Sequence, residues 1–298
     1  MRRAPGRAAE PLGSVGGVST RARLATGAIV AALAVIGGLV AWRSADGGTI
    51  AVAASAEVPA PGLDVLSGEW PTTTTAPPDL GPDAGITVSE PIGPPWPTEF
   101  TVADAVSSEI PIFEEPGVQV ATGRTLPNPT VEGYRLVMLV REEQDEWLKV
   151  QINSRPNGAT TWIRRSDVEL RTVPFWILIE RGAKRLTVFH GDDEEVFSTS
   201  VAPGKDATPT PLGFFYVDIL TRPTNPNGPY GAFQISVTGF SEVYDSFAGG
   251  IGQIAIHGTN RPELIGTPAS NGCVRMSNED VSTLVRLARQ GTPVWIVA

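Results

Sequence analysis

A stretch rich in Pro, Thr, Ala and Gly, residues 43–99, does most to limit what this chain can fold into. It contains PTTTT at 71–75 and PPWP at 94–97. Proline fixes its own backbone and lacks an amide donor, so a segment of this composition forms a disordered, semi-stiff linker without a hydrophobic core. We therefore expect globular structure on the C-terminal side of the linker, in residues 100–298.

Residues 24–42, on the N-terminal side of the linker, contain no charged side chain. An α-helix needs roughly 20 such residues to cross the hydrocarbon core of a bilayer. The tail before this run, residues 1–23, carries several arginines against one acid, Glu10, and its composition predicts disorder. Because basic flanks stay in the cytoplasm, the sequence predicts a single-pass anchor in the cell membrane with the remaining chain on the extracytoplasmic side.

A cleaved signal peptide is the alternative to this anchor. ASA at 54–56 is a small-residue site of the kind that signal peptidases cleave, but Arg43 and Asp46 lie between it and the apolar run. The run is also longer than the apolar part of a typical signal peptide, roughly 7–15 residues. We favour the uncleaved anchor, and under both interpretations the C-terminal part is exported.

Composition excludes several classes of function. With 298 residues the chain can form two folded units besides its extensions, and a net charge of −9 argues against a nucleic-acid partner. The single cysteine, Cys273, has no partner for an internal disulfide, and two histidines, His190 and His257, are too few for the usual zinc site. The sequence implies neither a metal nor a cofactor.

Residues 100–172 show the pattern of a small all-β unit. Short apolar stretches alternate with turn clusters, among them PNP at 127–129. WLKV at 147–150, followed by GATTWI at 158–163, resembles a bacterial SH3-like domain. Because a fold does not by itself give a function, this unit is either a binding module or a packing spacer without a ligand of its own.

Residues 173–298 predict a second, mainly β unit with few helices. Apolar stretches at 175–179 and 185–189 flank RGAK, which is the pattern of a β-hairpin. SNED at 277–280 is typical of a helix start, and apolar residues recur with helical spacing from Val281 onward. Further strands are expected at 195–201, 214–220, 233–237, 254–256 and 294–297.

The reactive side chains of this unit are Cys273 and His257. A thiol becomes a strong nucleophile as a thiolate, and an imidazole within hydrogen-bond reach is the usual way to generate one. His257 follows the predicted strand 254–256, and Cys273 stands on a loop close before the helix start, whose partial positive charge favours a thiolate. Gly272 before the cysteine and Arg275 after it argue against a small buried hydrophobe. The pattern predicts an active site.

The residues around this pair resemble a known family. HG at 257–258 and SNGCVR at 270–275 look like the signature of the YkuD-type L,D-transpeptidase catalytic domain of bacterial cell-wall enzymes. The family commonly carries histidine where this chain has Asn271. The resemblance implies a β-sandwich-like catalytic domain over residues 173–298, with Cys273, His257 and Gly258 as catalytic residues.

The resemblance also implies a reaction on peptidoglycan stem tetrapeptides. With His257 as base, the thiolate of Cys273 attacks the carbonyl that joins the third residue to the terminal D-alanine. The thioester then passes to the side-chain amine of a second stem, which gives a 3→3 cross-link. The carbonyl of Gly258 would orient the imidazole, and the amides of Gly272 and Cys273 would hold the oxyanion.

Five residues are candidate substrate contacts. Arg275 could bind a substrate carboxylate through its fork or form a structural salt bridge. Asn271 could contact substrate or brace the loop that it shares with Gly272 and Ser270. Tyr230 stands at the end of a Pro- and Gly-rich loop, residues 221–231, where the family places a substrate-covering lid, and a surface tyrosine without a role is the alternative.

Two other functions fit the same residues. A carboxypeptidase would use water instead of an amine to resolve the thioester, and only an acceptor pocket distinguishes the two reactions. A non-catalytic wall-binding module is the second alternative. The intact pair of His257 and Cys273 argues against that module, since binding requires neither side chain.

Overall fold

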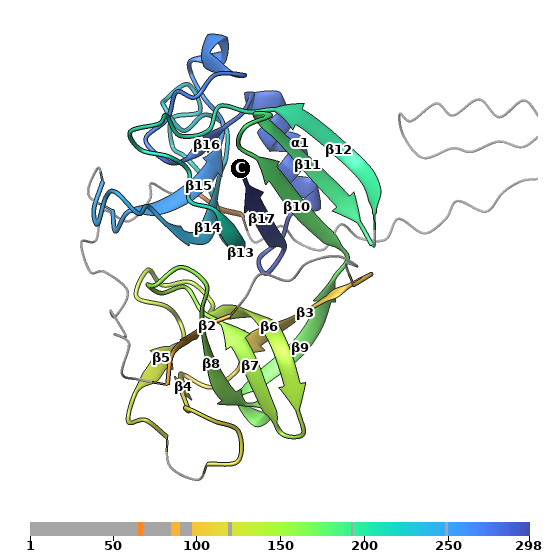
Figure 1. Cartoon of the computed structure of the whole chain (residues 1–298), viewed down its shortest axis with the longest axis vertical. Coiled ribbons are helices and arrows are strands. Elements are labelled where there is room, and N and C mark those ends of the chain that lie inside the picture. Colours follow the sequence, from red (N-terminus) through yellow and green to blue (C-terminus); the bar gives the residue numbers. More distant parts are fainter. Residues whose placement is uncertain (1–64, 68–84, 90–96, 119–120, 192, 248–249) are drawn as a thin grey trace, which may run out of the picture. The chain divides into compact units, whose positions relative to one another are not determined.

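The computed structural model describes residues 65–67, 85–89, 97–118, 121–191, 193–247 and 250–298 (Figure 1). The predicted tail (1–23), the predicted anchor (24–42) and most of the predicted linker lie outside these residues. No helix among the described residues is long and apolar enough to cross a membrane. All described residues belong to one compact unit, which contains two main sheets.

The first sheet has six strands in the order β2-β8-β7-β6-β3-β9. Its neighbours pair antiparallel throughout, and buried side chains of the sheet form a cluster that includes Leu148, Val150 and Ile163. A short hairpin of β4 and β5 packs on the same cluster. The bounds are β2 Thr87–Val88, β3 Phe100–Ala105, β4 Glu109–Pro111, β5 Thr125–Pro127, β6 Val137–Gln144, β7 Trp147–Gln151, β8 Ala159–Arg164, η1 Arg165–Asp167 and β9 Val168–Val173.

The second sheet has nine strands, in the order β12-β11-β10-β17-β13-β14-β15-β16, with β1 paired to β13. Three of its pairs are parallel: β10 with β17, β15 with β16, and β1 with β13. Its bounds are β1 Val65–Ser67, β10 Phe175–Glu180, β11 Arg185–His190, β12 Glu194–Ser200, β13 Gly213–Arg222, β14 Gln234–Phe240, β15 Gln253–His257, β16 Val274–Arg275 and β17 Pro293–Val297, with η2 at Pro262–Leu264 and α1 at Asn278–Leu287.

Helix α1 supplies the apolar layer that covers part of the second sheet. Its first turn is capped by Ser277, whose hydroxyl accepts from the backbone N–H of Asp280, as the sequence pattern predicts. Val281, Leu284 and Val285 are buried in one cluster with side chains of β10, β11 and β13. Figure 1 shows α1 beside β10 and β11. The predicted mainly β architecture with few helices is confirmed.

The two sheets share a hydrophobic cluster of their own. It combines Val137 and other first-sheet residues with Phe214 and Tyr216 of β13. The Tyr216 hydroxyl donates to the Val137 carbonyl over 3.1 Å, and Gln151 Nε2 donates to the Phe214 carbonyl over 2.7 Å. Buried polar groups that are paired across such a cluster fix one arrangement of the two layers.

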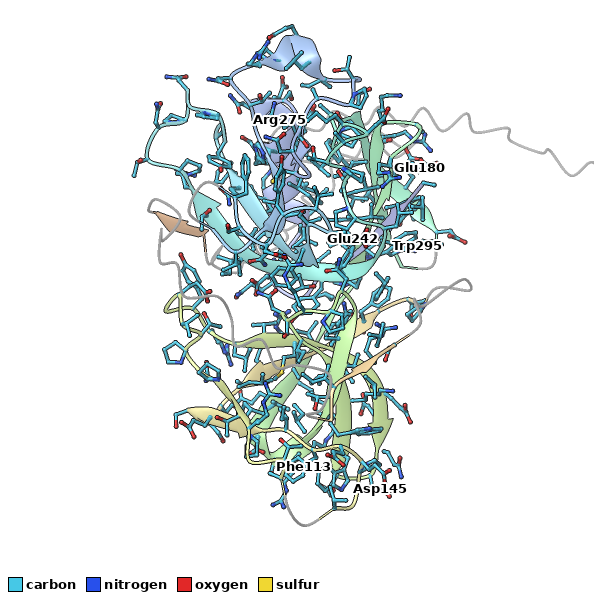
Figure 2. All side chains as sticks on the ribbon, turned by 60° about the vertical axis from the view of Figure 1, so that its left-hand side comes forward. Phe113, Asp145, Glu180, Glu242, Arg275 and Trp295 are labelled. Carbon is cyan, nitrogen blue, oxygen red and sulfur yellow. The ribbon has the colours of Figure 1, made fainter. Side chains whose placement is uncertain are left out.

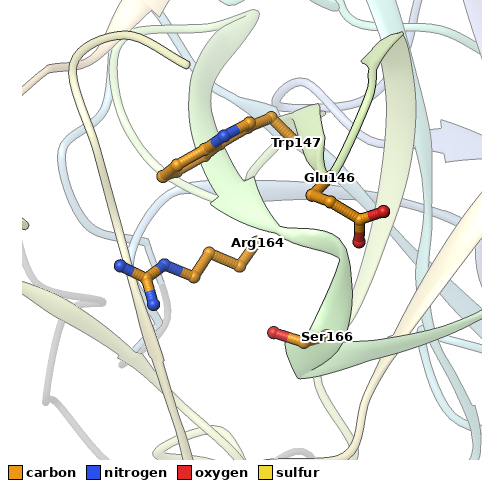
Figure 3. A pocket seen from close by; sticks show the side chains of 4 residues that line it. All are labelled: Glu146, Trp147, Arg164 and Ser166. Carbon is orange, nitrogen blue, oxygen red and sulfur yellow. The ribbon is translucent and has the colours of Figure 1, made fainter. Parts of the chain in front are cut away.

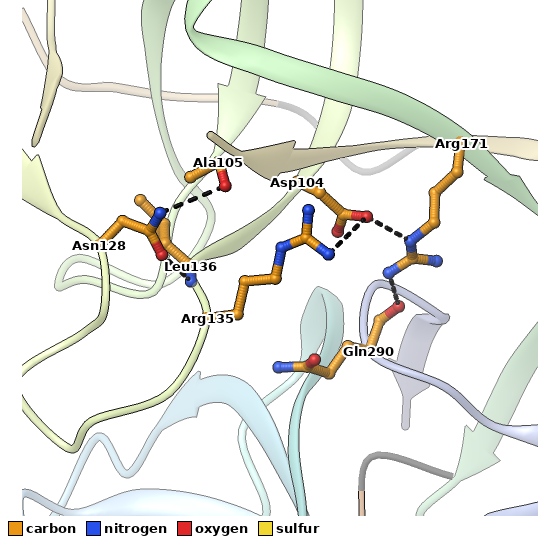
Figure 4. A network of polar contacts seen from close by, with 7 residues as sticks. All are labelled: Asp104, Ala105, Asn128, Arg135, Leu136, Arg171 and Gln290. Carbon is orange, nitrogen blue, oxygen red and sulfur yellow. Dashed lines mark hydrogen bonds and ion pairs between the residues drawn. The ribbon is translucent and has the colours of Figure 1, made fainter. Parts of the chain in front are cut away.

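An ion-pair network in the first sheet is joined to the second part by one hydrogen bond (Figure 4). Asp104 of β3 accepts from Arg171 Nε of β9 over 2.9 Å, and Arg135 Nη1 lies 3.7 Å from the same carboxylate oxygen. Arg171 Nη2 also donates to the carbonyl of Gln290, in the turn before β17, over 2.7 Å. β9 ends at Val173, so this first-sheet strand reaches the predicted boundary between the two units.

Candidate active site

Strand β15 and its two neighbouring strands bring the candidate active-site residues together. It pairs antiparallel with β14 on one side, where Gln234 is opposite His257, and parallel with β16 on the other, where Arg275 is opposite His257. Since residues two apart on a strand share a face, Ala255 and His257 present their side chains to the same side. Cys273 directly precedes β16 and so joins this neighbourhood.

His257 is buried, with 3% of its surface exposed, and its ring has a fixed hydrogen bond. Nδ1 lies 2.6 Å from the carbonyl oxygen of Gly258, the contact that the sequence predicts. A carbonyl oxygen only accepts, so Nδ1 carries the proton and Nε2 keeps its lone pair. Burial lowers the pKa of His257 to about 4, against a smaller raising effect of the Gly258 bond. The imidazole is therefore a neutral base at pH 7.

The loop that carries Cys273 is braced from within. The Ser270 hydroxyl accepts from the backbone N–H of Gly272 over 3.0 Å and donates to the carbonyl of Cys273. The backbone φ of Gly272 is 127°, a value that residues with a side chain rarely adopt. Ser270 is buried and its hydroxyl is used inside the loop, so the structure places it as a brace and not at the predicted substrate contact.

The Cys273 thiol is half-buried, and its environment favours the protonated form. Burial raises the pKa of Cys273, while a backbone hydrogen bond from Ala255 and the charge of Arg275 act in the opposite direction. The helix α1 begins only at Asn278, and Ser277 caps the Asp280 N–H of its first turn. The pair at rest is a neutral thiol and a neutral imidazole.

Tyr230 lies against this pair. Its ring centroid is 5.0 Å from that of His257, with the two rings inclined at 60°. Burial raises the pKa of Tyr230, and the negative charge of an ionised Cys273 raises it further. That electrostatic coupling and the ring contact place the tyrosine beside both the nucleophile and the base.

Arg275 is half-buried on β16, in the C-terminal part of the ribbon (Figure 2). Its Nε is buried and has no hydrogen-bond partner in the part of the chain that the structure describes. None of the ion pairs among the described residues includes this guanidinium, so the structural salt bridge considered as an alternative is not formed there. Its charge lowers the pKa values of Cys273, His257 and Tyr230.

A groove opens in front of Cys273, and its floor contains an unpartnered hydroxyl. The Ser236 Oγ of β14 is buried and finds no hydrogen-bond partner among the described residues, which is a costly state for a polar atom unless a ligand satisfies it. The groove is lined by Tyr230, Gln234, Ser236, Phe247, Gly250, Ile251, Gly252, Gln253, Ala255 and Cys273. Asn271, half-buried in the cysteine loop, is not among these residues.

Asn278 joins the Tyr230 loop to the histidine turn, a role that sequence reasoning missed. Its Oδ1 accepts from the backbone N–H groups of Ala232 and Thr259, each over 3.1 Å. A Cβ on Gly231 or on Gly258 would come within 2.0 and 2.2 Å of that oxygen, so both positions require glycine. In the sequence Asn278 forms part of a helix-start pattern, which hides this second use.

The first sheet has a concavity of its own, lined by Glu146, Trp147, Arg164 and Ser166 (Figure 3). The guanidinium of Arg164 lies 5.7 Å from the Trp147 ring and 5.2 Å from the Phe113 ring, and the two rings meet edge to face at 4.8 Å. This aromatic surface is thus partly covered by Arg164.

In the described part of the chain, no three His, Cys, Asp or Glu side chains come together as a metal site.

Comparison with known proteins agrees with this geometry. The L,D-transpeptidase catalytic domain family, YkuD, matches residues 174–296. The chain is 40% identical over 126 residues to the L,D-transpeptidase YkuD of Bacillus subtilis, a match that covers 42% of this chain and 67% of that protein. It is 36% identical over 134 residues to the L,D-transpeptidase YqjB of the same organism, which covers 41% of this chain and 70% of that protein.

Solved structures that match part of the chain include an L,D-transpeptidase from Mycobacterium smegmatis, with 14% identity, coverage of 54% of this chain and 90% of that chain, and a TM-score of 0.35. They also include Bd1075 of Bdellovibrio bacteriovorus, with 23% identity, coverage of 42% of this chain and 47% of that chain, and a TM-score of 0.33. The assignment depends on the sequence comparisons, and the residues that the family model matches include His257 and Cys273. Through residues 174–296 the chain belongs to the YkuD family of L,D-transpeptidase catalytic domains.

Proposed function

We propose that this protein is a peptidoglycan L,D-transpeptidase that forms 3→3 cross-links through a thioester on Cys273. The observation that carries the proposal is the fixed tautomer of His257, whose Nδ1 is bonded to the Gly258 carbonyl. This bond leaves Nε2 as the free base in the neighbourhood of the single thiol of the chain. A nucleophile, a base and a group that orients the base are the three parts that covalent acyl transfer needs.

In the first half-reaction His257 Nε2 takes the proton of Cys273 as Sγ attacks the donor carbonyl. The S–C bond forms, and the C–N bond to the terminal D-alanine then breaks. The imidazolium returns its proton to the leaving amine. Because both groups are neutral at rest, proton transfer accompanies the attack and no thiolate has to form beforehand.

In the second half-reaction the side-chain amine of an acceptor stem attacks the thioester. His257 accepts a proton from that amine and returns it to the sulfur as the C–S bond breaks. The new amide is the cross-link, and the neutral pair is restored. Water in place of the amine would give hydrolysis, which is the carboxypeptidase reaction.

The oxyanion of both half-reactions needs a donor near Sγ. The Gly272 N–H, which the sequence suggests, already donates to Ser270 Oγ over 3.0 Å. We therefore assign the role to the backbone N–H of Cys273 alone. The brace at Ser270 then acts by holding the cysteine loop in the conformation that presents this amide.

Three side chains are suited to hold the donor stem. Arg275 offers a half-buried guanidinium without an internal ion pair, which suits a stem carboxylate. Ser236 offers a buried hydroxyl at the groove floor that a peptide carbonyl would satisfy. Tyr230 covers the catalytic pair from the side of its loop. A peptide that meets all three would lie along the groove with its scissile carbonyl at Cys273.

The proposed substrate lies outside the cell membrane, and the predicted topology agrees with that location. We propose that residues 24–42 anchor the chain, that residues 43–99 span part of the distance to the wall, and that residues 100–172 form an SH3-like unit. Catalysis then takes place on the cell-wall side. The uncharged run, the basic tail before it and the Pro- and Thr-rich linker support this arrangement.

Mass spectrometry of the full-length protein in detergent, incubated with a disaccharide tetrapeptide, tests the proposal. We expect release of D-alanine, a thioester adduct on the wild type, and a cross-linked dimer. The Cys273→Ala variant should give none of these. Tripeptide without dimer would identify a carboxypeptidase. Unchanged substrate in the presence of folded wild type would contradict both enzymes and favour a binding module.

A further inference from the structure

We propose that the β7–β8 turn of the first sheet, residues 152–158, positions one wall of the substrate groove. The wall consists of residues 241–247 and 250–252, between β14 and β15. Arg155 and Asn157 of the turn hold this wall through its backbone. The inference deepens the proposed function, because the substrate used in its test is the one proposed above.

Arg155 donates hydrogen bonds to both segments of the wall, residues 241–247 and 250–252. Its Nη1 donates to the Ser241 carbonyl over 3.0 Å, and its Nη2 donates to the carbonyls of Tyr244 over 3.1 Å and Ile251 over 3.4 Å. The guanidinium carbon also lies 4.9 Å from the ring centroid of Phe240. A planar fork with fixed donors is suited to this use, since its hydrogen bonds define both distance and direction.

Asn157 fixes the point where the wall leaves the sheet. Its Nδ2 donates to the Phe240 carbonyl over 2.9 Å, and its Oδ1 accepts from the Phe240 N–H over 2.8 Å. The side-chain amide thus pairs with both backbone groups of the last residue of β14, as a neighbouring strand would. The start of the wall is held by the first sheet.

The guanidinium lies directly behind the groove surface. Gly252 lines the groove, and a Cβ there would come within 2.3 Å of the Tyr244 carbonyl oxygen and 3.0 Å of Arg155 Nη2. Its φ of 74° is in the left-handed region as well. Only glycine lets the backbone of the groove approach Arg155 this closely.

The opposite side of the wall faces the nucleophile. Phe247, Gly250, Ile251 and Gly252 line the same groove as Cys273. The tip is closed by two backbone hydrogen bonds between Phe247 and Gly250, at 3.0 and 2.9 Å. Phe247 is 44% exposed, so this aromatic side chain is open to contact from a ligand. A shift of the wall would move these groups relative to Sγ.

The bonds of Arg155 and Asn157 are separate from those that dock the two sheets elsewhere. Docking also uses the shared apolar cluster, the bond from Gln151 to Phe214, and the bond from Arg171 to Gln290. None of these residues lines the groove. Arg171 is therefore a matched control, because it is also an arginine of the first sheet that donates to a backbone carbonyl of the second part (Figure 4).

Saturation kinetics of Cys273 acylation separate positioning from folding. We compare the full-length wild type, Arg155→Ala, Arg155→Lys, Asn157→Ala and Arg171→Ala at increasing concentrations of the disaccharide tetrapeptide. Arg155→Ala and Asn157→Ala should raise the half-saturating concentration by about 10-fold, because a displaced wall loses contacts with the substrate, with less than about a threefold change in limiting rate. Arg155→Lys should be intermediate, because an ammonium group cannot reach three carbonyls in fixed directions.

Two controls isolate the wall. Alkylation of Cys273 by iodoacetamide, which is too small to need the wall, should proceed at one rate in all five proteins. Arg171→Ala should saturate as the wild type does. Amide hydrogen exchange should accelerate in residues 241–247 and 250–252 of Arg155→Ala while α1 keeps its protection.

The outcomes distinguish this inference from the proposed function. A wild type that is not acylated contradicts the proposed function, and the exchange experiment then decides the positioning role by itself. An acylated wild type with the same half-saturating concentration in Arg155→Ala and Asn157→Ala overturns the inference. So does unchanged exchange in the wall of Arg155→Ala. Where Arg155→Ala fails to fold, Asn157→Ala provides both measurements.

Discussion

Burial shifts the pKa values of the two candidate catalytic side chains in opposite directions. It raises the pKa of the Cys273 thiol and lowers that of the His257 imidazole, because in each case the charged form is the one that loses solvation. An ion pair of thiolate and imidazolium is thus disfavoured at rest. A neutral thiol also resists oxidation, because oxidation proceeds through the thiolate.

Alkylation of Cys273 should therefore depend steeply on pH. We expect the rate with iodoacetamide to keep rising through pH 8.5, where an ordinary thiol is half ionised, because burial raises the pKa of Cys273. The rate for the urea-unfolded protein should level off at lower pH. Stopped-flow or mass-spectrometric labelling measures both curves. A plateau below pH 7 in the folded protein would show a preformed thiolate.

The His257→Ala substitution should lower the rate at which the tetrapeptide acylates Cys273. We expect a factor of about 10² or more at pH 7, which is the scale of a lost general base. Raising the pH should restore part of the rate, because the thiolate then forms without assistance. In the wild type, activity should persist as the pH falls to 5 and decline through pH 4, where the imidazole of pKa about 4 becomes protonated. Loss of activity at pH 6.5 would contradict the lowered pKa.

At the scale of elements, β15 and α1 together determine where the imidazole lies. β15 places His257 at a buried strand end, and α1 begins with Asn278, which holds the turn that follows. The same asparagine holds Ala232, two residues after Tyr230. One side chain therefore connects the predicted lid loop with the base.

Asn278→Ala should destabilise the fold and slow acylation together. Two backbone N–H groups, those of Ala232 and Thr259, would lose their acceptor, at a cost of about 1–3 kcal/mol for a buried unpaired group. Urea denaturation measures the loss of stability. Asn278→Asp keeps an acceptor at a helix start and should retain most of both properties. If Asn278→Asp loses as much stability and acylation rate as Asn278→Ala, the hydrogen bonds accepted by Oδ1 do not explain the role of Asn278.

Regular elements were predictable where the pattern is local. Hairpin β10–β11 follows from two apolar stretches around a short turn, and α1 follows from its cap and its helical spacing. β1 and β2 fall within the predicted linker. They join the sheets through backbone pairing, for which the sequence of an edge strand gives little sign.

The sequence indicated Cys273 and His257 as candidate site residues through a motif with fixed spacing. It did not indicate Ser236, because a serine within an apolar strand shows its lack of a partner only in three dimensions.

At the scale of the whole molecule, one buried carboxyl lies where the two sheets and the groove meet. Asp218 of β13 accepts from Asn153 of the β7–β8 turn over 2.8 Å and from Gln253 of the groove over 3.1 Å. Burial raises the pKa of Asp218 to about 7, and the hydrogen bond from Gln253 opposes that shift. The first sheet and the substrate groove thus share a titratable group.

Stability should fall as Asp218 ionises. A carboxyl with a raised native pKa binds its proton more tightly when folded, so its favourable effect is complete below the ordinary value near 3.8 and is lost as the pH rises through about 7. The difference is on the order of 4 kcal/mol across that range. The Asp218→Asn variant should show a smaller change in the free energy of unfolding over this pH range, and it should be more stable than the wild type at pH 8.5. Urea denaturation at pH 5, 7 and 8.5 measures the free energy of unfolding of both proteins. An equal dependence on pH in the two proteins would contradict a raised pKa of Asp218.

The apolar cluster that the two sheets share limits how such a chain can be recombined in evolution. Tyr216 belongs to the second sheet, yet its hydroxyl is satisfied by Val137 of the first, and Val102 fills the space beside Gly291. A gene fusion that exchanged residues 100–172 for an unrelated module would expose Phe214 and Tyr216 to water and leave polar groups of β13 unpaired. We therefore expect exchange of residues 100–172 to destabilise the second sheet, so that new specificities arise more readily by changes at the junction of the two parts.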